Sequence, residues 1–387
     1  MNILFLIKSL GLGGLEIVTS TLANKFSEEG HRVCVYAFEK RSGLLCDLFV
    51  ENVKVFIAGK YHVSYENVNL LREVLIDHHI QVVINQWGLP LIPIRTICKA
   101  KKGLDVKVIS VYHNDPLKNG RLQNVENEIQ NSKKTISKFI FCLKKITYRC
   151  ITGLSMRYNY NHCDLFEVLS PNYIRHFQQF IWMNSTPKLK VLTNPLTIDN
   201  KDFIYVREYK RNEVLYVGRM DYTQKRIDRI IDVWSHIEFI IPDWQLTIVG
   251  GGNEQKNMKN MVDNLNLKHV YFEDFQNPRP YYERASILIL TSEFEGFPLV
   301  LAECMSFGVV PVVYGSFSAV YDIIENGKDG IIIPKTSAGF NVALMSEKVK
   351  ALVFDKPRLN QMALSAIEKS KKYSLDKIYQ QWIEVMQ

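Results

Sequence analysis

Short apolar runs alternate with segments of helical periodicity along the first half of the chain. The runs are rich in Val and Ile and predict buried strands at residues 2–7, 31–36, 53–58, 81–85 and 106–112. Residues 16–29 and 70–78 carry apolar side chains at helical spacing and lie between strands. Strands that are apolar on both faces and separated by helices indicate a parallel, doubly wound sheet.

The same alternation restarts after a polar, charged stretch at 197–211. The strands predicted there are 214–217, 246–249, 270–272, 285–290, 309–313 and 330–333, and a helix is predicted at 228–237. Two such series predict an α/β protein with two Rossmann-like doubly wound domains that face a cleft. We assign residues 1–195 to the first domain and 212–372 to the second.

Composition excludes several classes of protein. The apolar share of 47% and the charged share of 23% are ordinary for a globular chain. Seven cysteines without a C-x2-C pair indicate a reducing, cytoplasmic compartment. His and Cys residues show no metal-ligand spacing, so we expect no bound metal. No stretch approaches the ~18 uncharged apolar residues that a membrane span needs.

The net charge of +8 is concentrated in one region. Residues 99–157 hold 13 Lys and Arg against four acids, a local charge of +9, and the rest of the chain sums to −1. This concentration favours an anionic surface or acceptor over general affinity for nucleic acid.

Within that region, residues 131–157 contain seven basic residues and no acid, and predict a basic amphipathic helix. One face carries Ile136, Phe139, Ile140, Leu143, Ile146 and Leu154, and the opposite face carries Lys134, Lys138, Lys145 and Arg149. Two interpretations stay open. The apolar face packs into the domain core, or the helix docks on an anionic membrane that holds a lipid-linked acceptor.

The most informative motif is 292–303, Ser-Glu-Phe-Glu-Gly-Phe-Pro-Leu-Val-Leu-Ala-Glu. A strand ends before it, and a helix is predicted to begin near Pro298. The N–H groups of a helix start form an anion site, and a carboxylate on the helix can bind two vicinal hydroxyls. An acid that complements the helix dipole would explain Glu295, but it would not explain Glu303, which lies eight positions further on.

Other candidate phosphate contacts follow strands. The strand at 214–217 leads into Gly218-Arg219, and Lys225 follows, so two cations could offset a diphosphate. Surface cations are, however, usually just solvated. Glycine turns at 11–14 and 249–253 would let backbone N–H groups approach a phosphate. The first turn is not a G-x-G-x-x-G fingerprint, and no acid ends the second strand, which disfavours a dinucleotide site.

Together these motifs resemble the family-4 glycosyltransferases, retaining enzymes with two Rossmann-like domains, the GT-B fold. The resemblance spans essentially the whole chain, up to the closing segment 373–382. In that family the final helix returns to the first domain, which implies the same for residues 373–387. The sequence departs from the family at Asp274, where relatives usually have glycine, and at Asn194-Pro195, where many have Asn-Gly.

The resemblance implies a role for each motif. Glu303 would bind the ribose hydroxyls, and Glu295 would contact the transferred sugar. Arg219 and Lys225 would offset the diphosphate. The remaining implied donor contacts are Phe297, Pro298, Leu299, Gly13, Gly14, Gly250 and Phe275. His113, at the end of a strand in the first domain, matches a family histidine that faces the donor sugar.

The function implied is transfer of a sugar, with retention, from a nucleoside diphosphate donor to an acceptor hydroxyl. UDP is the preferred carrier, with GDP and ADP left open. The acceptor would be a glycan or a lipid-linked glycan, and no cofactor, metal or nucleic acid is expected. Alternatives are an epimerase of the same fold, an NAD-dependent oxidoreductase or a non-enzymatic binder of sugar nucleotides.

Overall fold

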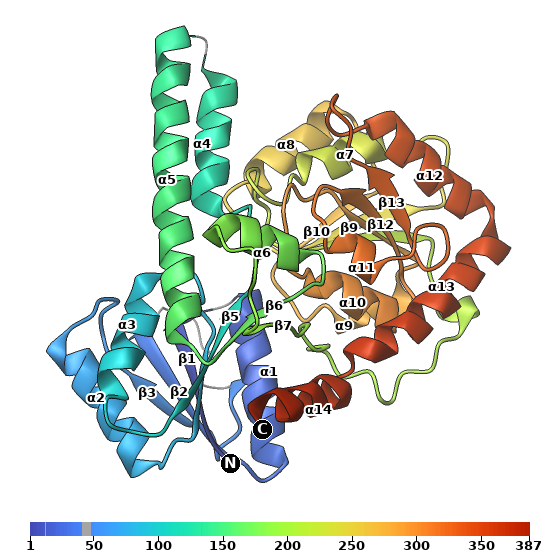
Figure 1. The fold of residues 1–387 in the computed structure, drawn as a ribbon. Helices are drawn as coiled ribbons and strands as arrows, with labels where there is room; N and C mark the ends of the chain where they lie inside the picture. Colours follow the sequence, from blue (N-terminus) through green and yellow to red (C-terminus); the bar gives the residue numbers. More distant parts are fainter. Residues whose placement is uncertain (12, 41–47, 133) are drawn as a thin grey trace. The chain divides into compact units, whose positions relative to one another are not determined.

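The computed structural model describes residues 1–11, 13–40, 48–132 and 134–387 (Figure 1). They form two compact units, one of residues 1–197 and 375–387 and the other of residues 198–374. We call these unit 1 and unit 2. Leu12 of the first glycine turn and Lys133 of the predicted basic helix lie outside the described residues.

Unit 1 contains a parallel sheet with the strand order β3-β2-β1-β4-β5-β6-β7. The strands are β1 (Asn2–Leu10), β2 (Arg32–Lys40), β3 (Lys54–Ile57), β4 (Val82–Asn85), β5 (Lys107–Tyr112), β6 (Leu165–Val168) and β7 (Leu189–Val191). The helices are α1 (Gly14–Glu28), α2 (Tyr65–Asp77), α3 (Leu91–Ala100), α4 (Gly120–Asn131), α5 (Thr135–His162), α6 (Tyr173–Ile181) and α14 (Leu375–Met386). The strand order reverses between β1 and β4, where ligands bind in sheets of this kind.

Unit 2 repeats the arrangement with the order β10-β9-β8-β11-β12-β13, again parallel. The strands are β8 (Glu213–Val217), β9 (Gln245–Val249), β10 (Val270–Glu273), β11 (Ile287–Leu290), β12 (Val310–Gly315) and β13 (Ile331–Pro334). The helices are α7 (Asp228–Ser235), α8 (Gln255–Asn264), α9 (Arg279–Arg284), α10 (Leu299–Ser306), α11 (Val320–Ile323), α12 (Val342–Phe354) and α13 (Lys356–Ser370). Short 3-10 helices occupy Arg207–Tyr209 and Lys371–Tyr373.

The predicted fold class is confirmed, because both sheets are parallel and built from alternating strands and helices. Every strand predicted in the sequence is present, with ends shifted by a few residues. The pattern missed β6 and β7. The buried Glu167 interrupts the apolar pattern of β6. β7 has only three residues, with Lys190 at its centre, so neither strand forms an apolar run.

The final helix, α14, packs within unit 1 against α1. Lys25 Nζ lies 2.5 Å from Asp376 Oδ1, and the rings of Phe26 and Tyr379 meet at 5.1 Å. Lys107 Nζ also donates to the carbonyls of Val385 and Met386, both at 3.0 Å, at the end of α14. Through these contacts α14, which follows unit 2 in sequence, packs against α1 and β5 of unit 1.

Helices α4 and α5 lie side by side as a helical hairpin (Figure 1). The predicted helix at 131–157 is wrong at its start, because Asn131 ends α4 and α5 begins at Thr135. Asn119 caps α4 by accepting a hydrogen bond from the N–H of Leu122 at 3.1 Å. None of the helices in the described part of the chain is long and apolar enough to cross a membrane.

Candidate active site

A buried ion pair joins two loops of unit 2. Lys225 follows β8 and Glu295 follows β11, and these strands are neighbours in the parallel sheet. Their carboxyl ends therefore meet at one edge, the ligand side of such sheets. Lys225 Nζ lies 2.6 Å from Glu295 Oε1, and the two side chains are 16% and 8% exposed. The structure thus brings together two of the predicted site residues.

Gln224 connects the same loops and was missed in the sequence. Its side-chain amide donates to the carbonyl of Phe294 at 3.2 Å and to Glu295 Oε2 at 3.3 Å. The backbone carbonyl of Gln224 accepts a hydrogen bond from the backbone N–H of Glu293 at 2.7 Å. Gln224 therefore fixes where the Glu295 carboxylate lies. No spacing or composition distinguishes this glutamine from a solvated one.

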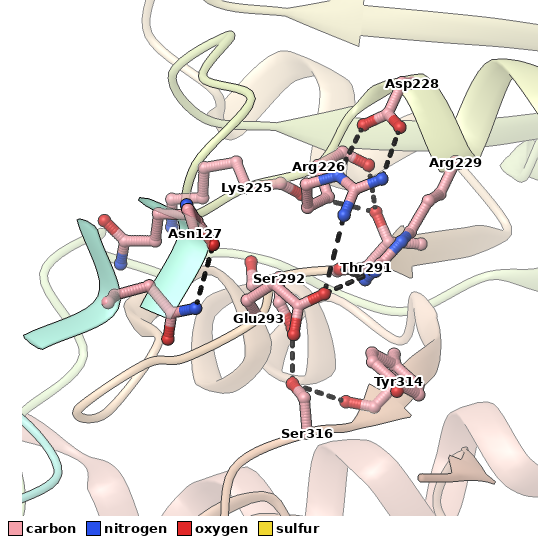
Figure 2. Close-up of polar contacts among 12 residues, drawn as sticks. Asn127, Lys225, Arg226, Asp228, Arg229, Thr291, Ser292, Glu293, Tyr314 and Ser316 are labelled. Atoms are coloured by element: carbon pink, nitrogen blue, oxygen red, sulfur yellow. Dashed lines mark hydrogen bonds and ion pairs between the residues drawn. The ribbon is translucent and has the colours of Figure 1, made fainter. Parts of the chain in front are cut away.

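Arg226 and Arg229 form further ion pairs in the segments that follow β8 and β11 (Figure 2). Arg226 forms a bidentate pair with Asp228, at 3.0 and 2.8 Å, and Arg229 pairs with Glu293. The hydroxyl of Thr291 donates to the carbonyl of Arg226 at 2.8 Å. These arginines have their charges offset by Asp228 and Glu293. Lys225 and Arg219 remain the cations predicted to meet a diphosphate, although Lys225 is itself paired with Glu295.

Arg219 has a fixed backbone and an exposed side chain. The hydroxyl of the buried Tyr216 donates to the carbonyl of Arg219 at 2.8 Å. The guanidinium contacts the protein through Gln224 Oε1 at 3.5 Å. Burial raises the pKa of Tyr216 well above its ordinary value, so its hydroxyl remains a donor. The predicted cation is therefore carried on a rigid turn, with its charge in solvent.

Gly250 is required by packing between two loops. Its φ is +132°, and a Cβ there would lie 2.2 Å from the carbonyl oxygen of Gly218. The N–H of Met220 also donates to the carbonyl of Gly251 at 2.8 Å. The loops after β8 and β9 thus lie backbone to backbone. The side chain of Phe275, after β10, is 67% exposed.

Glu303 is buried on α10, the helix predicted to begin near Pro298. The hydroxyl of Tyr282, on α9, donates to Glu303 Oε2 at 3.1 Å. Leu299 is the first residue of α10, and its cap residue Pro298 makes no side-chain hydrogen bond to the helix start. The ring of Phe297 meets Tyr373 edge to face at 5.2 Å. Tyr282 was not anticipated in the sequence.

In unit 1, His113 follows β5 and is half-buried. Its Nε2 lies 2.5 Å from Gln86 Oε1, after the neighbouring strand β4. Burial lowers the pKa of His113 to about 4, so the imidazole is neutral at physiological pH. Gln86 was missed in the sequence, because it follows an apolar strand like any loop residue.

The glycine turn of unit 1 leads into α1, with Gly13 as cap residue and Gly14 as first helical residue. A Cβ on Gly13 would lie 2.5 Å from Glu16 Oε2. A carboxylate therefore already lies against the turn predicted to receive a phosphate. Glu16 is the third residue of the helix, where an acid complements the helix dipole. Glu16 was missed in the sequence, and its place three residues into the helix is the signal that could have identified it.

The apolar face of α5 is exposed. Its side chains are 50% to 77% exposed at Ile136, Phe139, Ile140, Leu143, Ile146 and Leu154. The interpretation that this face packs into the core is wrong, because α4 covers a different side of the helix. Ile151 extends the exposed row and is 54% exposed.

The cations of α5 are not equivalent. Lys145 Nζ lies 2.7 Å from Glu126 on α4, and Lys144 pairs with Glu128 at the same distance. Arg149 donates to the carbonyls of Phe180 and Gln179 at the end of α6. Two of the four cations predicted to form the outer face therefore stabilise the unit. Lys134 and Lys138 are exposed and pair with no acid in the described part of the chain.

The residues that the structure describes contain no group of three or more His, Cys, Asp or Glu placed to hold a metal ion. In unit 2 the charged groups near the sheet edge instead form pairs, Lys225 with Glu295 and Arg226 with Asp228.

Comparisons of the sequence identify both halves. Residues 12–180 match the family described as Glycosyltransferase Family 4, and residues 197–369 match Glycosyl transferases group 1. An uncharacterized glycosyltransferase of Haemophilus influenzae is 29% identical over 53% of this chain, and the match spans 57% of that protein. This chain therefore spans little more than half of that relative.

A Campylobacter jejuni relative is 23% identical over 100% of this chain and 98% of its own length. Its name is GalNAc-alpha-(1->4)-GalNAc-alpha-(1->3)-diNAcBac-PP-undecaprenol alpha-1,4-N-acetyl-D-galactosaminyltransferase. The structure of Anabaena Alr3699/HepE in complex with UDP and glucose has a TM-score of 0.74 at 16% identity, and the match covers 99% and 98% of the two chains. With two parallel Rossmann-like units and a family match in each, this chain belongs to the family-4 glycosyltransferases of the GT-B fold.

Proposed function

We propose that this glycosyltransferase moves a hexosyl or N-acetylhexosaminyl group from a UDP-sugar to an acceptor hydroxyl, with retention of configuration. The acceptor is a lipid-linked or polysaccharide glycan used in cell-surface glycan synthesis. The observation that carries the proposal is the buried pair of Lys225 and Glu295 at the carboxyl edge of β8 and β11. The cation proposed to meet the phosphate and the carboxylate proposed to meet sugar hydroxyls lie 2.6 Å apart in this pair.

The departing UDP needs its growing negative charge offset. Lys225 supplies a buried cation, Arg219 an exposed one, and the first N–H groups of α10 add a helix dipole. The bond between the sugar C1 and the phosphate oxygen breaks, and a bond from C1 to the acceptor oxygen forms on the same face. The leaving phosphate oxygen takes the acceptor proton. With these cations the reaction requires no divalent metal and no other cofactor.

Glu303 is proposed to hold the ribose. The Tyr282 hydroxyl donates to its carboxylate, and the residue is buried on α10. A carboxylate can accept two vicinal hydroxyl hydrogens at once. The proposal of UDP as carrier is supported by the relative crystallised with UDP and glucose.

The protein is proposed to act in the cytoplasm, on the inner face of the membrane. The exposed apolar row of α5 would lie in the headgroup layer, with Lys134 and Lys138 near anionic lipid phosphates. At 28 residues, α5 is about 42 Å long, enough for the row to lie along the surface. The relative whose name includes undecaprenol supports a lipid-linked acceptor.

The test combines binding with product analysis. UDP, GDP, ADP and NAD are compared by thermal shift, and a ligand at 100 times its Kd should stabilise the protein by about 2.7 kcal/mol. Purified protein is then incubated with UDP-sugars and a polyprenyl diphosphate-linked glycan, and products are analysed by mass spectrometry and NMR. We expect stabilisation by UDP and a product with the donor's anomeric configuration.

Three outcomes would contradict the proposal. Stabilisation by NAD alone would indicate an oxidoreductase. Interconversion of UDP-sugars without acceptor would indicate an epimerase, and an inverted linkage would exclude retention. A further test is Lys225→Met, which keeps most of the side-chain length but removes the cation, and it should lose transfer.

A further inference from the structure

Gln86 and His113 meet at the carboxyl ends of neighbouring strands in unit 1. Gln86 follows β4, His113 follows β5, and Gln86 Oε1 lies 2.5 Å from His113 Nε2. The side chain of Gln86 is buried, and its backbone N–H donates to the carbonyl of Leu6 at 3.0 Å. The contact therefore joins two residues whose backbones the sheet holds in place.

The residues on either side of Gln86 are closely packed against β5. The N–H of Gly88 donates to the carbonyl of Val111 at 2.9 Å. A Cβ at Gly88 would lie 2.8 Å from that same oxygen and 2.9 Å from the ring of Phe166. Before Gln86, the side chain of Asn85 donates to Ser110 Oγ at 3.0 Å. The turn is thus attached to β5 on both sides of Gln86.

The chemistry of an amide oxygen determines which imidazole nitrogen carries the proton. Oε1 of glutamine only accepts hydrogen bonds, so the facing Nε2 of His113 must carry hydrogen. A neutral imidazole has one N–H, and Nδ1 is then a bare acceptor. Within the described residues, His113 Nδ1 is buried and has no hydrogen-bond partner.

The side-chain amide nitrogen of Gln86, like His113 Nδ1, has no hydrogen-bond partner within the described residues. It is a donor, and it too is buried. The pair therefore presents one unused acceptor and one unused donor. Buried polar groups left without partners are uncommon, and a ligand is one way to satisfy them. A sugar hydroxyl suits both atoms, because it donates and accepts.

We propose that Gln86 is a positioning residue that holds His113 as the Nε2–H tautomer, so that Nδ1 accepts a hydrogen from a hydroxyl of the bound sugar. The proposal deepens the proposed transferase function and rests on it for the identity of the ligand. The tautomer itself does not depend on any substrate. Burial supports the neutral state, because it lowers the pKa of His113 to about 4.

The tautomer can be measured by NMR on the full chain with ¹⁵N-labelled imidazoles at pH 7, assigned by the loss of one signal in His113→Asn. We expect His113 in the unliganded wild type to have a protonated Nε2 and a bare Nδ1. Gln86→Met, of similar length but without the acceptor, should give the averaged signals of mixed tautomers. In Gln86→Glu an ionised carboxylate retains an acceptor oxygen and should restore the hydrogen on Nε2.

The matched control is Gln81→Met, at the opposite end of the same strand. Gln81 Oε1 accepts from the N–H of Asn2 at 3.0 Å, so this change also removes one hydrogen bond. It should leave the His113 signals unchanged. A wild-type His113 protonated at Nδ1, or a tautomer that survives Gln86→Met, would overturn the proposal. The wild-type spectrum by itself decides which nitrogen of His113 carries the proton, so a Gln86 variant that fails to fold does not prevent the test.

Kinetics then separate positioning from simple structural support. Gln86→Met should lower kcat about tenfold with KM for the donor changed less than twofold. Unchanged kcat in Gln86→Met would overturn the positioning role. If no donor supports transfer by the wild type, the proposed function fails, whereas the NMR result still decides the tautomer.

Discussion

Lys225 Nζ and Glu295 Oε1 are 2.6 Å apart, in side chains that expose 16% and 8% of their surface. Their loops are 70 residues apart in sequence and are joined again by Gln224. A buried pair of this kind is stable only while both charges are present. The same two residues thus hold the loops after β8 and β11 together and are proposed to contact the donor.

We expect Lys225→Ala and Glu295→Ala each to lower kcat for sugar transfer by roughly 10², the scale of losing one preorganised charge contact. The double variant should lose little more, since the residues act as a unit. The control is Lys328→Ala, which breaks the exposed 2.9 Å pair with Glu325 in the same unit. Near-normal transfer by both single variants, with Tm unchanged, would place the site elsewhere.

Glu303→Ala should weaken UDP binding more than tenfold, because the proposed ribose contacts to a charged group are lost. Tyr282→Phe removes only the hydroxyl that orients Glu303, and should weaken binding about fivefold. Isothermal titration with UDP measures both. Tyr205→Phe is the control, since it loses a 3.0 Å hydrogen bond to Asn360 in the same unit. Equal losses in the two tyrosine variants would argue against a specific role of Tyr282.

Transfer should persist in EDTA, because Lys225, Arg219 and the start of α10 are proposed to offset the diphosphate charge. Initial rates with and without EDTA should agree within about twofold, a difference of about 0.4 kcal/mol in the barrier. Activity that disappears in EDTA and returns with Mg²⁺ or Mn²⁺ would contradict this prediction.

Membrane docking should depend on the apolar row of α5 more than on its cations. A triple variant in which Ile136, Leu143 and Ile146 are each changed to Ser should be released from phosphatidylglycerol vesicles at all salt concentrations. Changing Lys134 and Lys138 to Gln should weaken binding only at low salt, since each cation contributes about 1 kcal/mol. Co-sedimentation measures both effects.

The control for docking is Phe239→Ser, which changes an apolar residue of unit 2 that is 72% exposed. It should sediment like the wild type. If the triple Ser variant also sediments like the wild type, α5 does not face lipid. Dimerisation of the wild type that the triple variant loses would identify a second copy as the partner instead.

Glu167 predicts a pH dependence of stability in unit 1. Its side chain is fully buried on β6, neither oxygen has a partner within the described residues, and burial raises its pKa from 4.5 to about 8. The unfolded chain ionises first as pH rises. Stability therefore falls by about 1.4 kcal/mol per pH unit between pH 4.5 and pH 8, and this loss is complete above the folded pKa.

Glu167→Gln keeps the shape and stays neutral. Its Tm should match the wild type near pH 4 and exceed it increasingly up to pH 8. Glu347→Gln, at an exposed site, should show no such trend. A Tm difference independent of pH would show that Glu167 is not neutral in the folded protein.

The sequence alone determined every strand except β6 and β7, and the site motifs carried on single segments. The run at residues 82–84 is apolar at every position, which is typical of a strand covered on both faces. The spacing of Glu295 and Glu303 around a helix start is also a local property. Hence the two Rossmann-like domains and the family could be predicted from one chain.

Contacts between distant segments were decided by the tertiary structure. Gln86 and Gln224 carry no local signal, and they acquire a role because parallel strands bring their ends to one edge. Helical periodicity showed that α5 has an apolar face, but the same pattern suits a core helix and an exposed one. The packing of α4 on the other side decided this, because a helix face is buried only where another element covers it.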